Sequence, residues 1–307
     1  MANSIIQMSG GLGNQLFQFA IKRSVEYATG STTKLDIAWY RYKSDKFDRN
    51  PEITKFLGNK SDYIDSTNYL LSISGLLQWK GVRDFYRKHI EAQLLNSHKK
   101  LNLNVKLEKN IKQISDFVNS YSVGSFIESR YWASHSDTII DEIRDSLSQV
   151  NLEDELISPD RIVIHARRGD YFLDAKTRNF HGYCSLEHFI EGVAIIDEMD
   201  EWHSIIIYSD SPGFASELQS ELISRYTKPV RVVMENNPVK ILVNFQETNF
   251  FIGSNSTLSW WGNALGKHKV SIFPSAWFAN NNEHVYGKDY FLDDVKFTSM
   301  PLLTRGV

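Results

Sequence analysis

Residues 161–171 read Arg161-Ile162-Val163-Ile164-His165-Ala166-Arg167-Arg168-Gly169-Asp170-Tyr171, and this stretch decides the fold prediction. Its run of apolar, β-branched residues at 162–164 predicts a buried strand. Polar side chains follow together where that strand ends. Arginine offers a rigid fork of N–H donors that matches a phosphate group, and it stays charged at any working pH. The stretch therefore predicts an anion site at a sheet edge, although a salt-bridged surface turn has the same composition.

The rest of the second half alternates between two patterns. Short apolar runs predict strands at 161–165, 204–208, 230–234, 249–253 and 270–273, and longer periodic runs predict helices at 186–199, 213–226, 239–247 and 257–265. Strands that alternate with helices form parallel, doubly wound sheets, which bind ligands at the carboxyl ends of their strands. The second half is therefore predicted to be an α/β domain of this kind.

Polar residues follow three of these predicted strands. They are His165, Arg167, Arg168 and Asp170 after the first, Asp210 between two serines after the second, and Ser254, Asn255 and Ser256 after the fourth. Each group alone is typical of an ordinary turn or helix cap. Together they place two arginines, carboxylates and a helix N-terminus on one edge, which predicts a pyrophosphate pocket. The chain has no Walker-type lysine loop, which argues against ATP cleavage.

The N-terminal segment predicts a strand at 4–8, a glycine turn, a helix at 14–29 and a second strand at 34–40. The turn at Gly11 and Gly13 leaves backbone N–H groups free to meet an anion or a sugar hydroxyl. A dinucleotide site is the alternative, but Leu16 occupies its third glycine position, which argues against NAD. The amides of Asn14 and Gln15 could bind a ligand or cap the helix.

The middle of the chain is less regular. Residues 41–125 predict helices and loops with a few short strands, residues 125–132 a strand that reaches a cleft, and residues 136–150 a helix. The acidic stretch 151–160, which ends in Ser158-Pro159, predicts a boundary between an N-terminal domain of residues 1–158 and a C-terminal domain of residues 159–307.

Composition limits the function classes. Of 307 residues, 42% are hydrophobic and 23% charged, and the net charge of −3 argues against nucleic acid or an anionic membrane as the main partner. Cys184 is the one cysteine, so no intramolecular disulfide can form, as is typical of a reducing compartment. Without a signal peptide or a membrane-spanning run, the chain is expected to be cytoplasmic.

Three stretches resemble the motifs of one family. They are Gly10-Gly11-Leu12-Gly13-Asn14-Gln15-Leu16-Phe17-Gln18-Phe19-Ala20, His165-Ala166-Arg167-Arg168-Gly169-Asp170-Tyr171 and Ser254-Asn255-Ser256-Thr257-Leu258-Ser259-Trp260-Trp261. In this order they resemble the α-1,2-fucosyltransferases of glycosyltransferase family 11, and Tyr208-Ser209-Asp210 resembles a fourth, shorter motif. The resemblance runs from about residue 5 to residue 277. Two stretches depart from the family pattern, Tyr131-Trp132-Ala133-Ser134 and Gly262-Asn263-Ala264-Leu265, which leaves the acceptor preference open.

The resemblance implies a fold and an activity. The expected fold is GT-B-like, with two Rossmann-type domains facing across a cleft, the first on the acceptor side and the second binding GDP-fucose. The expected reaction is inverting transfer of L-fucose from GDP-β-L-fucose to the 2-hydroxyl of a terminal β-galactoside, without metal or cofactor. The setting would be bacterial O-antigen or surface glycan synthesis. The acceptor could be lipid-linked, with the enzyme peripheral at the inner membrane and free of an integral membrane segment.

Matching motif positions give the expected site. Arg167 would hold the pyrophosphate, Ser254, Asn255 and Ser256 would meet the phosphates or ribose, Asp210 would lie beside the nucleotide, and Asn14 would reach across from the other domain. Arg168, Gly11 and Gly13 complete the expected nucleotide-sugar contacts. Asp170 and His165 are candidates for a base, although orienting the arginines is the favoured role for both. A non-catalytic sugar-nucleotide-binding protein on the same scaffold is the alternative function.

Overall fold

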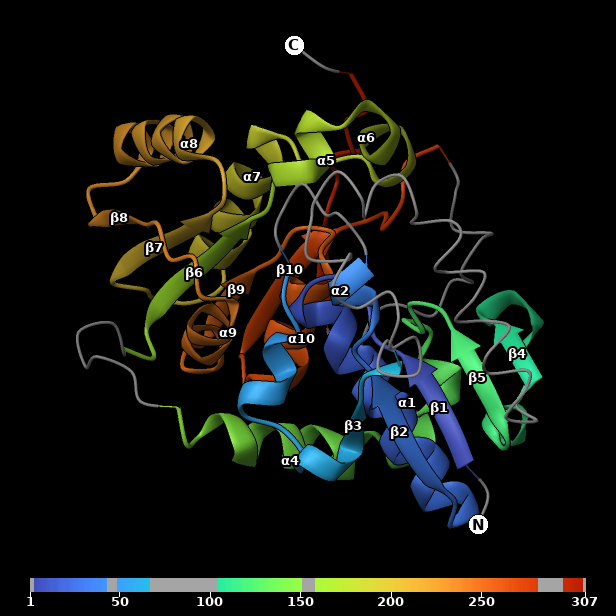
Figure 1. Ribbon diagram of the computed structural model, residues 1–307. Helices are drawn as coiled ribbons and strands as arrows, with labels where there is room; N and C mark the ends of the chain where they lie inside the picture. Colours follow the sequence, from blue (N-terminus) through green and yellow to red (C-terminus); the bar gives the residue numbers. More distant parts are fainter. Residues whose placement is uncertain (1–2, 43–48, 67–103, 151–157, 281–294, 306–307) are drawn as a thin grey trace. The chain divides into compact units, whose positions relative to one another are not determined.

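The computed structural model describes residues 3–42, 49–66, 104–150, 158–280 and 295–305 (Figure 1). The chain divides into two compact units, Met1–Ser146 and Leu147–Val307. Each unit has its own sheet, of five strands in the first and six in the second among the described residues. Of the stretch expected to mark the domain boundary, residues 151–157 lie outside the described part of the chain.

The N-terminal unit contains a parallel sheet in the order β3-β2-β1-β5-β4. Its strands are β1 (Asn3–Gln7), β2 (Thr32–Asp36), β3 (Tyr63–Ile64), β4 (Asn104–Leu107) and β5 (Ser120–Val123). Helix α1 (Leu12–Thr29) connects β1 to β2 and buries the apolar side chains of Leu16, Phe17, Ile21 and Val25. It ends at Gly30, whose φ of 67° is the left-handed conformation that favours glycine at a helix end.

Shorter elements complete this unit. They are the helices α2 (Trp39–Tyr42) and α4 (Ser136–Leu147) and the 3₁₀ turns η1 (Glu52–Lys55), η2 (Lys60–Asp62), η5 (Glu108–Asn110), η6 (Ile114–Phe117), η7 (Ser129–Tyr131) and η8 (Ala133–His135). Helix α4 confirms the helix predicted at 136–150. Among the described residues, no helix combines the length and apolar character needed to cross a bilayer.

One strand prediction in this unit was correct in kind but shifted, since β2 occupies Thr32–Asp36, and another was wrong. The strand predicted at 34–40 ends at Asp36, whose carboxylate accepts the backbone N–H of Ala38 (3.0 Å) and turns the chain. The strand predicted at 125–132 is instead loop and 3₁₀ turn, and the strand of this region is β5. The backbone N–H groups of Ser125 and Phe126 donate to the Glu108 side chain, so they are not available to a sheet.

The C-terminal unit contains a parallel sheet in the order β11-β10-β9-β6-β7-β8. Its strands are β6 (Arg161–Ala166), β7 (Ser204–Ser209), β8 (Val230–Val233), β9 (Phe250–Ile252), β10 (Val270–Pro274) and β11 (Val295–Thr298). The chain runs outward from β6 through β7 and β8, then returns to the other side of β6 as β9 and continues outward. The predicted doubly wound parallel sheet is therefore confirmed.

Helices cover both faces of this sheet. The helices on these faces are α7 (Leu186–Asp197), α8 (Pro212–Arg225), α9 (Pro238–Gln246) and α10 (Thr257–Leu265). The shorter helices α5 (Gly169–Leu173) and α6 (Ala175–His181) follow β6 and pack against each other. Figure 1 shows α7 and α8 on one face and α9 and α10 on the other. The core between α7, α8 and the sheet is almost entirely apolar and includes Ile162, Ile164, Ile205, Ile207 and Ile252. This packing fixes the strand ends, from which the polar loops extend.

Candidate active site

The polar motifs of the C-terminal unit meet at the point where its strand order reverses. Strands β6 and β9 are adjacent and parallel, with Ile164 opposite Ile252, yet their connections run to opposite sides. The loops after two such strands diverge and leave a crevice, which is where open α/β sheets bind ligands. Arg167 follows β6, Ser254 follows β9, and the Arg167 backbone N–H donates to Ser254 Oγ (3.4 Å).

The Arg167 guanidinium is held by two carboxylates. One terminal nitrogen lies 2.7 Å from Asp210 and the other 2.8 Å from Asp170. Burial opposes the charge on Arg167, but the attraction of Asp210 and Asp170 more than offsets it, so the pKa of Arg167 is raised. The side chain is 28% exposed, which leaves part of a fixed positive charge at the crevice. This is the arrangement expected of an arginine that receives a phosphate.

Asp210 also shapes the turn after β6. Its Oδ1 accepts the backbone N–H groups of Arg168 (2.8 Å) and Gly169 (3.0 Å), while Oδ2 pairs with Arg167. A Cβ at residue 169 would lie 2.2 Å from that Oδ2, so only glycine allows this close approach. The structure therefore gives Asp210 a position that orients Arg167 and its turn.

The Arg168 side chain has a different set of partners from Arg167. Its guanidinium carbon lies 3.9 Å from the ring centroid of Phe214, 4.5 Å from that of Tyr183 and 4.8 Å from that of Phe172. Burial in this aromatic cluster lowers the pKa of Arg168. These contacts assign the side chain to cation–π packing. The expected contact of Arg168 with the nucleotide remains a prediction that this geometry does not support.

The Ser254–Asn255–Ser256 stretch anchors the loop after β9. Ser256 Oγ accepts the N–H of Leu258 (3.3 Å) and caps α10. Asn255 is fully buried, and its Nδ2 donates to the carbonyls of His181 (2.9 Å) and Trp277 (3.1 Å). The thiol of Cys184 lies 3.8 Å from Asn255 Oδ1. Asn255 thus ties three segments together beneath the crevice, and its expected contact with phosphate or ribose remains a prediction.

His165 lies under the crevice, with 6% of its surface exposed. Its Nδ1 is 2.6 Å from the hydroxyl oxygen of Ser259, and Ser259 Oγ accepts the N–H of Ser254 (3.2 Å). Burial, with a smaller contribution from the charge of Arg167, lowers the pKa of His165 to about 3. A neutral, enclosed imidazole of this kind orients its neighbours and is poorly placed to take a proton from an acceptor hydroxyl. The geometry therefore favours the orienting role.

The glycine turn of the N-terminal unit exposes one amide and buries another. Gln15 donates to the carbonyls of Gly10 (3.1 Å) and Asn50 (2.8 Å) and accepts the N–H of Ile53 (3.0 Å), so it braces the turn. Asn14 is half-buried, and its side chain makes no hydrogen bond to another residue within the described part of the chain. Neither amide caps α1, whose N-cap residue is Gly11. Among the described residues, the side-chain amide of Asn14 is therefore available to a ligand, whereas that of Gln15 is already occupied by hydrogen bonds within the turn.

Comparison with known proteins identifies the family. The sequence model of the family described as Glycosyl transferase family 11 matches residues 4–294. The chain belongs to glycosyltransferase family 11. An α-1,2-colitosyltransferase of Escherichia coli is 22% identical over 91% of this chain and 93% of its own length. The O-antigen biosynthesis glycosyltransferase WbnK of the same organism is 24% identical over 93% of this chain and 98% of its own length.

Solved structures support the fold of this family 11 glycosyltransferase. The heptosyltransferase WaaC of E. coli, solved with ADP-2-deoxy-2-fluoro heptose, is similar with a TM-score of 0.50 and 10% identity, over 97% of this chain and 93% of that one. At this identity the likeness shows the fold alone. The prediction of a GT-B-like α/β chain with two Rossmann-type units is confirmed.

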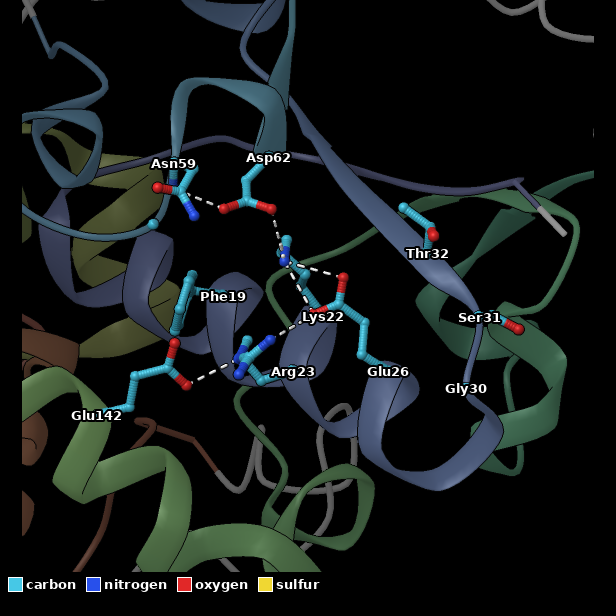
Figure 2. A pocket seen from close by; sticks show the side chains of 11 residues that line it. Phe19, Lys22, Arg23, Glu26, Gly30, Ser31, Thr32, Asn59, Asp62 and Glu142 are labelled. Atoms are coloured by element: carbon cyan, nitrogen blue, oxygen red, sulfur yellow. Dashed lines mark hydrogen bonds and ion pairs between the residues drawn. The ribbon is translucent and has the colours of Figure 1, made fainter. Parts of the chain in front are cut away.

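A cavity of about 420 Å³ in the N-terminal unit of the glycosyltransferase lies at the opposite edge of the sheet from the glycine turn. It lies at the end of α1 and the start of β2, the amino edge of the sheet, whereas the glycine turn follows the carboxyl end of β1. Figure 2 shows Lys22 directed between Glu26 (2.9 Å) and Asp62 (3.1 Å), with Arg23 paired to Glu142. These paired charges link α1 to η2 and α4, which is a structural ion-pair network.

Three side chains that contact the Arg167 site or the glycine turn and its neighbouring loop were not predicted from the sequence. Ser259 partners His165, Gln18 links the glycine turn to β5, and Glu108 holds the loop after β5. Ser259 and Gln18 lie inside the quoted motifs and could have been examined as partners. Glu108 follows an edge strand in a stretch without a motif, so no local signal marked it.

Proposed function

We propose that this enzyme transfers L-fucose from GDP-β-L-fucose to the 2-hydroxyl of a terminal β-galactoside, with inversion, in the synthesis of an O-antigen or another surface glycan. The observation that carries the proposal is the Arg167 guanidinium, fixed by Asp170 and Asp210 at the reversal point of a family 11 chain. The names of the two E. coli relatives support the α-1,2 linkage and the O-antigen setting.

In the proposed reaction, the bond between fucose C1 and the β-phosphate oxygen breaks while the acceptor oxygen attacks from the opposite face. Negative charge then develops on the leaving GDP, and positive charge on the ring oxygen and C1 of fucose. Arg167 would stabilise the leaving phosphate, and its two carboxylate partners would hold the guanidinium fork in a fixed direction. No metal or cofactor is assigned to the reaction.

The N-terminal unit is proposed to bind the acceptor. The available Asn14 amide is the side chain of the glycine turn that would contact the substrates, with the backbone N–H groups at Gly11 and Gly13 beside it. His165 and Asp170 would orient Ser259 and Arg167, respectively, and neither is assigned as the base. The acceptor proton would leave late, to solvent or a phosphate oxygen.

A second donor is also supported by an observation. The alignment with the α-1,2-colitosyltransferase of E. coli covers 91% of this chain. Colitose is fucose without its 3-hydroxyl, so a colitosyl donor presents the same diphosphate to Arg167. The two donors differ only where the sugar ring contacts the protein.

The decisive experiment offers purified protein GDP-fucose and GDP-colitose in parallel, with EDTA present and with lactose or a Galβ1,3-GalNAc glycoside as acceptor. GDP release and NMR of the product give the turnover and linkage. An α-1,2-fucosylated product in EDTA is expected, and turnover that requires added Mg²⁺ or Mn²⁺ would contradict the metal-independent mechanism. Turnover with GDP-colitose but not with GDP-fucose would identify colitose as the transferred sugar. GDP binding without turnover of either donor would favour the non-catalytic alternative.

A further inference from the structure

Glu108 lies at the carboxyl edge of the N-terminal sheet, directly after β4. In the parallel order β1-β5-β4, this is the edge from which the glycine turn after β1 and the loop after β5 also extend. Parallel α/β sheets bind their ligands at that edge. An acidic side chain there, which the proposed reaction does not use, therefore needs an explanation.

The Glu108 carboxylate holds the loop after β5 with both oxygens. Oε2 accepts the backbone N–H of Ser125 (2.8 Å), and Oε1 accepts that of Phe126 (2.9 Å). Phe126 has a φ of 53°, which a non-glycine residue seldom adopts, and its ring is fully buried against Phe117, at 5.3 Å between centroids. A Cβ at residue 124 would lie 2.5 Å from Glu108 Cβ, so Gly124 permits the close approach. The carboxylate thus stabilises a strained loop.

This loop is joined to the glycine turn by Gln18. The Gln18 side chain donates to the Gly124 carbonyl (3.1 Å) and accepts the N–H of Ser9 (3.0 Å). Gln18 lies four residues after Asn14 on α1, so the two residues share one face of the helix. A continuous set of hydrogen bonds therefore runs from Glu108 through Gly124 and Gln18 to the turn that carries Asn14.

We infer that Glu108 is a positioning residue, which fixes the loop after β5 and, through Gln18, the glycine turn in the conformation that receives the acceptor sugar. The inference deepens the proposed function and rests on it for the identity of the acceptor. The clamp itself rests only on contacts within the N-terminal unit.

The protonation state of Glu108 changes the strength of this clamp. Burial raises the pKa of Glu108 to about 7, against the opposing effect of the two backbone N–H groups. The titratable groups that face it among the described residues are Glu128, Arg130 and Tyr131, and Arg130 is paired with Glu128 at 2.6 Å. Because this pKa lies above the ordinary value of a hydrated glutamate, the clamped loop binds the proton more tightly than the opened loop does. The loop should therefore be held more firmly at pH 6 than at pH 8.

The test measures hydrogen exchange of the full chain by mass spectrometry, in peptides that cover residues 124–127, at pH 6 and pH 8 after correction for intrinsic rates. Wild type is compared with Glu108→Gln, which retains the shape but loses the charge and one acceptor. Asp116→Asn is the matched control, because Asp116 Oδ2 also accepts two backbone N–H groups, those of Lys112 (3.0 Å) and Gln113 (3.1 Å). These bonds, together with the Lys106 ammonium at 3.0 Å from Oδ1, lower its pKa to about 2.

At pH 8, Glu108→Gln is expected to exchange about tenfold faster at 124–127, because the amide NH2 group cannot accept a hydrogen bond and one buried backbone N–H loses its acceptor. Asp116→Asn should match wild type there. In the wild type, exchange corrected for intrinsic rates should be faster at pH 8 than at pH 6. Equal rates at 124–127 in all three proteins, or no pH effect in wild type, would overturn the inference.

The catalytic readout uses lactose as the acceptor probe and GDP-fucose as donor. Glu108→Gln should raise the KM for lactose about tenfold, while kcat and the Kd of GDP change less than about threefold, because uniform acceptor binding is lost. An unchanged KM for lactose, or an equal loss of GDP affinity, would contradict a positioning role on the acceptor side. If no donor is used by wild type, the proposed function fails, and the exchange pattern alone decides whether Glu108 holds the loop.

Discussion

The carboxylate of Asp210 contacts the guanidinium of Arg167 at 2.7 Å with one oxygen and the backbone N–H groups of the following two residues with the other. One side chain from the loop after β7 thereby fixes both the charge and the backbone of the turn after β6. The arginine is held in place before any ligand arrives, which lowers the reorganisation needed for catalysis.

Replacement of Arg167 by alanine should lower kcat/KM about 10²- to 10³-fold, because the leaving diphosphate loses its charged donor. Arg167→Lys should recover only part of this loss, since an ammonium group cannot reproduce the guanidinium fork. Initial rates of GDP release measure both. Arg225→Ala, which removes an exposed arginine of α8, is the control. Near-normal turnover in Arg167→Ala would refute the proposed mechanism.

Asp210→Asn should lower kcat about tenfold, because Arg167 loses one of its two fixed partners and small misplacements are costly in catalysis. The Kd of GDP should change by less than about threefold, since the lost orientation is offset by the lost repulsion between carboxylate and phosphate. Steady-state kinetics and calorimetry give the two quantities. Glu221→Gln, which breaks a surface pair on α8, is the control, and an Asp210 variant with wild-type kcat would show that the pair has no orienting role.

Arg168→Met should separate packing from ligand binding. The substitution keeps a long side chain among the rings of Phe172, Tyr183 and Phe214 but removes the cation–π contacts, at a cost of about 1–2 kcal/mol in the free energy of unfolding. The Kd of GDP should stay within about twofold of wild type. Denaturant unfolding and calorimetry measure the two effects. A large loss of GDP affinity without a loss of stability would restore Arg168 as a nucleotide ligand.

The stability of the enzyme should fall as the pH is lowered below 6.5. Burial lowers the pKa of His165 to about 3 and those of His181 and His188 to about 4, so the unfolded chain binds these protons first. Each such histidine removes about 1.4 kcal/mol of stability per pH unit between its unfolded and folded pKa values. Glu108 has the opposite effect on stability. Its pKa is raised to about 7, so between about pH 4.5 and 7 the folded state binds a proton that the unfolded chain does not, and this stabilises the folded state as the pH falls.

Thermal unfolding between pH 4.5 and 7.5 checks this net proton uptake. His188→Gln should reduce the change in the free energy of unfolding with pH by the equivalent of about one proton. His203→Gln, at an exposed position, should leave this pH dependence unchanged. A melting temperature that rises as the pH falls from 6.5 to 4.5 would contradict the assignment of the buried histidines as neutral.

Five of the six described strands of the C-terminal unit could be predicted from sequence, because each is a short apolar run that ends in polar or glycine residues. The edge strand β11 was not predicted, since its Val-Lys-Phe-Thr sequence is too short and too polar to stand out. Strand β6 was expected at 161–165 and ends at Ala166, and β7 was expected at 204–208 and ends at Ser209. The apolar runs are continuous here because these strands are buried on both faces. In the N-terminal unit the strand predicted at 34–40 ended early, since the side chain of Asp36 turns the chain and no apolar pattern records that hydrogen bond.

The sequence placed both arginines of the C-terminal motif at a sheet edge but could not separate their roles. Arg167 and Arg168 are adjacent, and the difference arises from Asp210 on one side and from aromatic rings on the other, which come from distant parts of the chain. For the same reason, Glu108 could not be recognised. Its partners lie 17 and 18 residues further along the chain, and only the pairing of β4 with β5 brings them together.

The burial of Cys184 beside Asn255 has a practical consequence for spectroscopy. Burial raises the pKa of this thiol to about 12, so the only cysteine of the chain should resist maleimide reagents in the folded protein. Leu173, at the end of α5, is 74% exposed. A Leu173→Cys variant should therefore accept a single fluorophore four residues from Gly169 without removal of the natural cysteine, and its emission would follow nucleotide arrival at the Arg167 turn in real time.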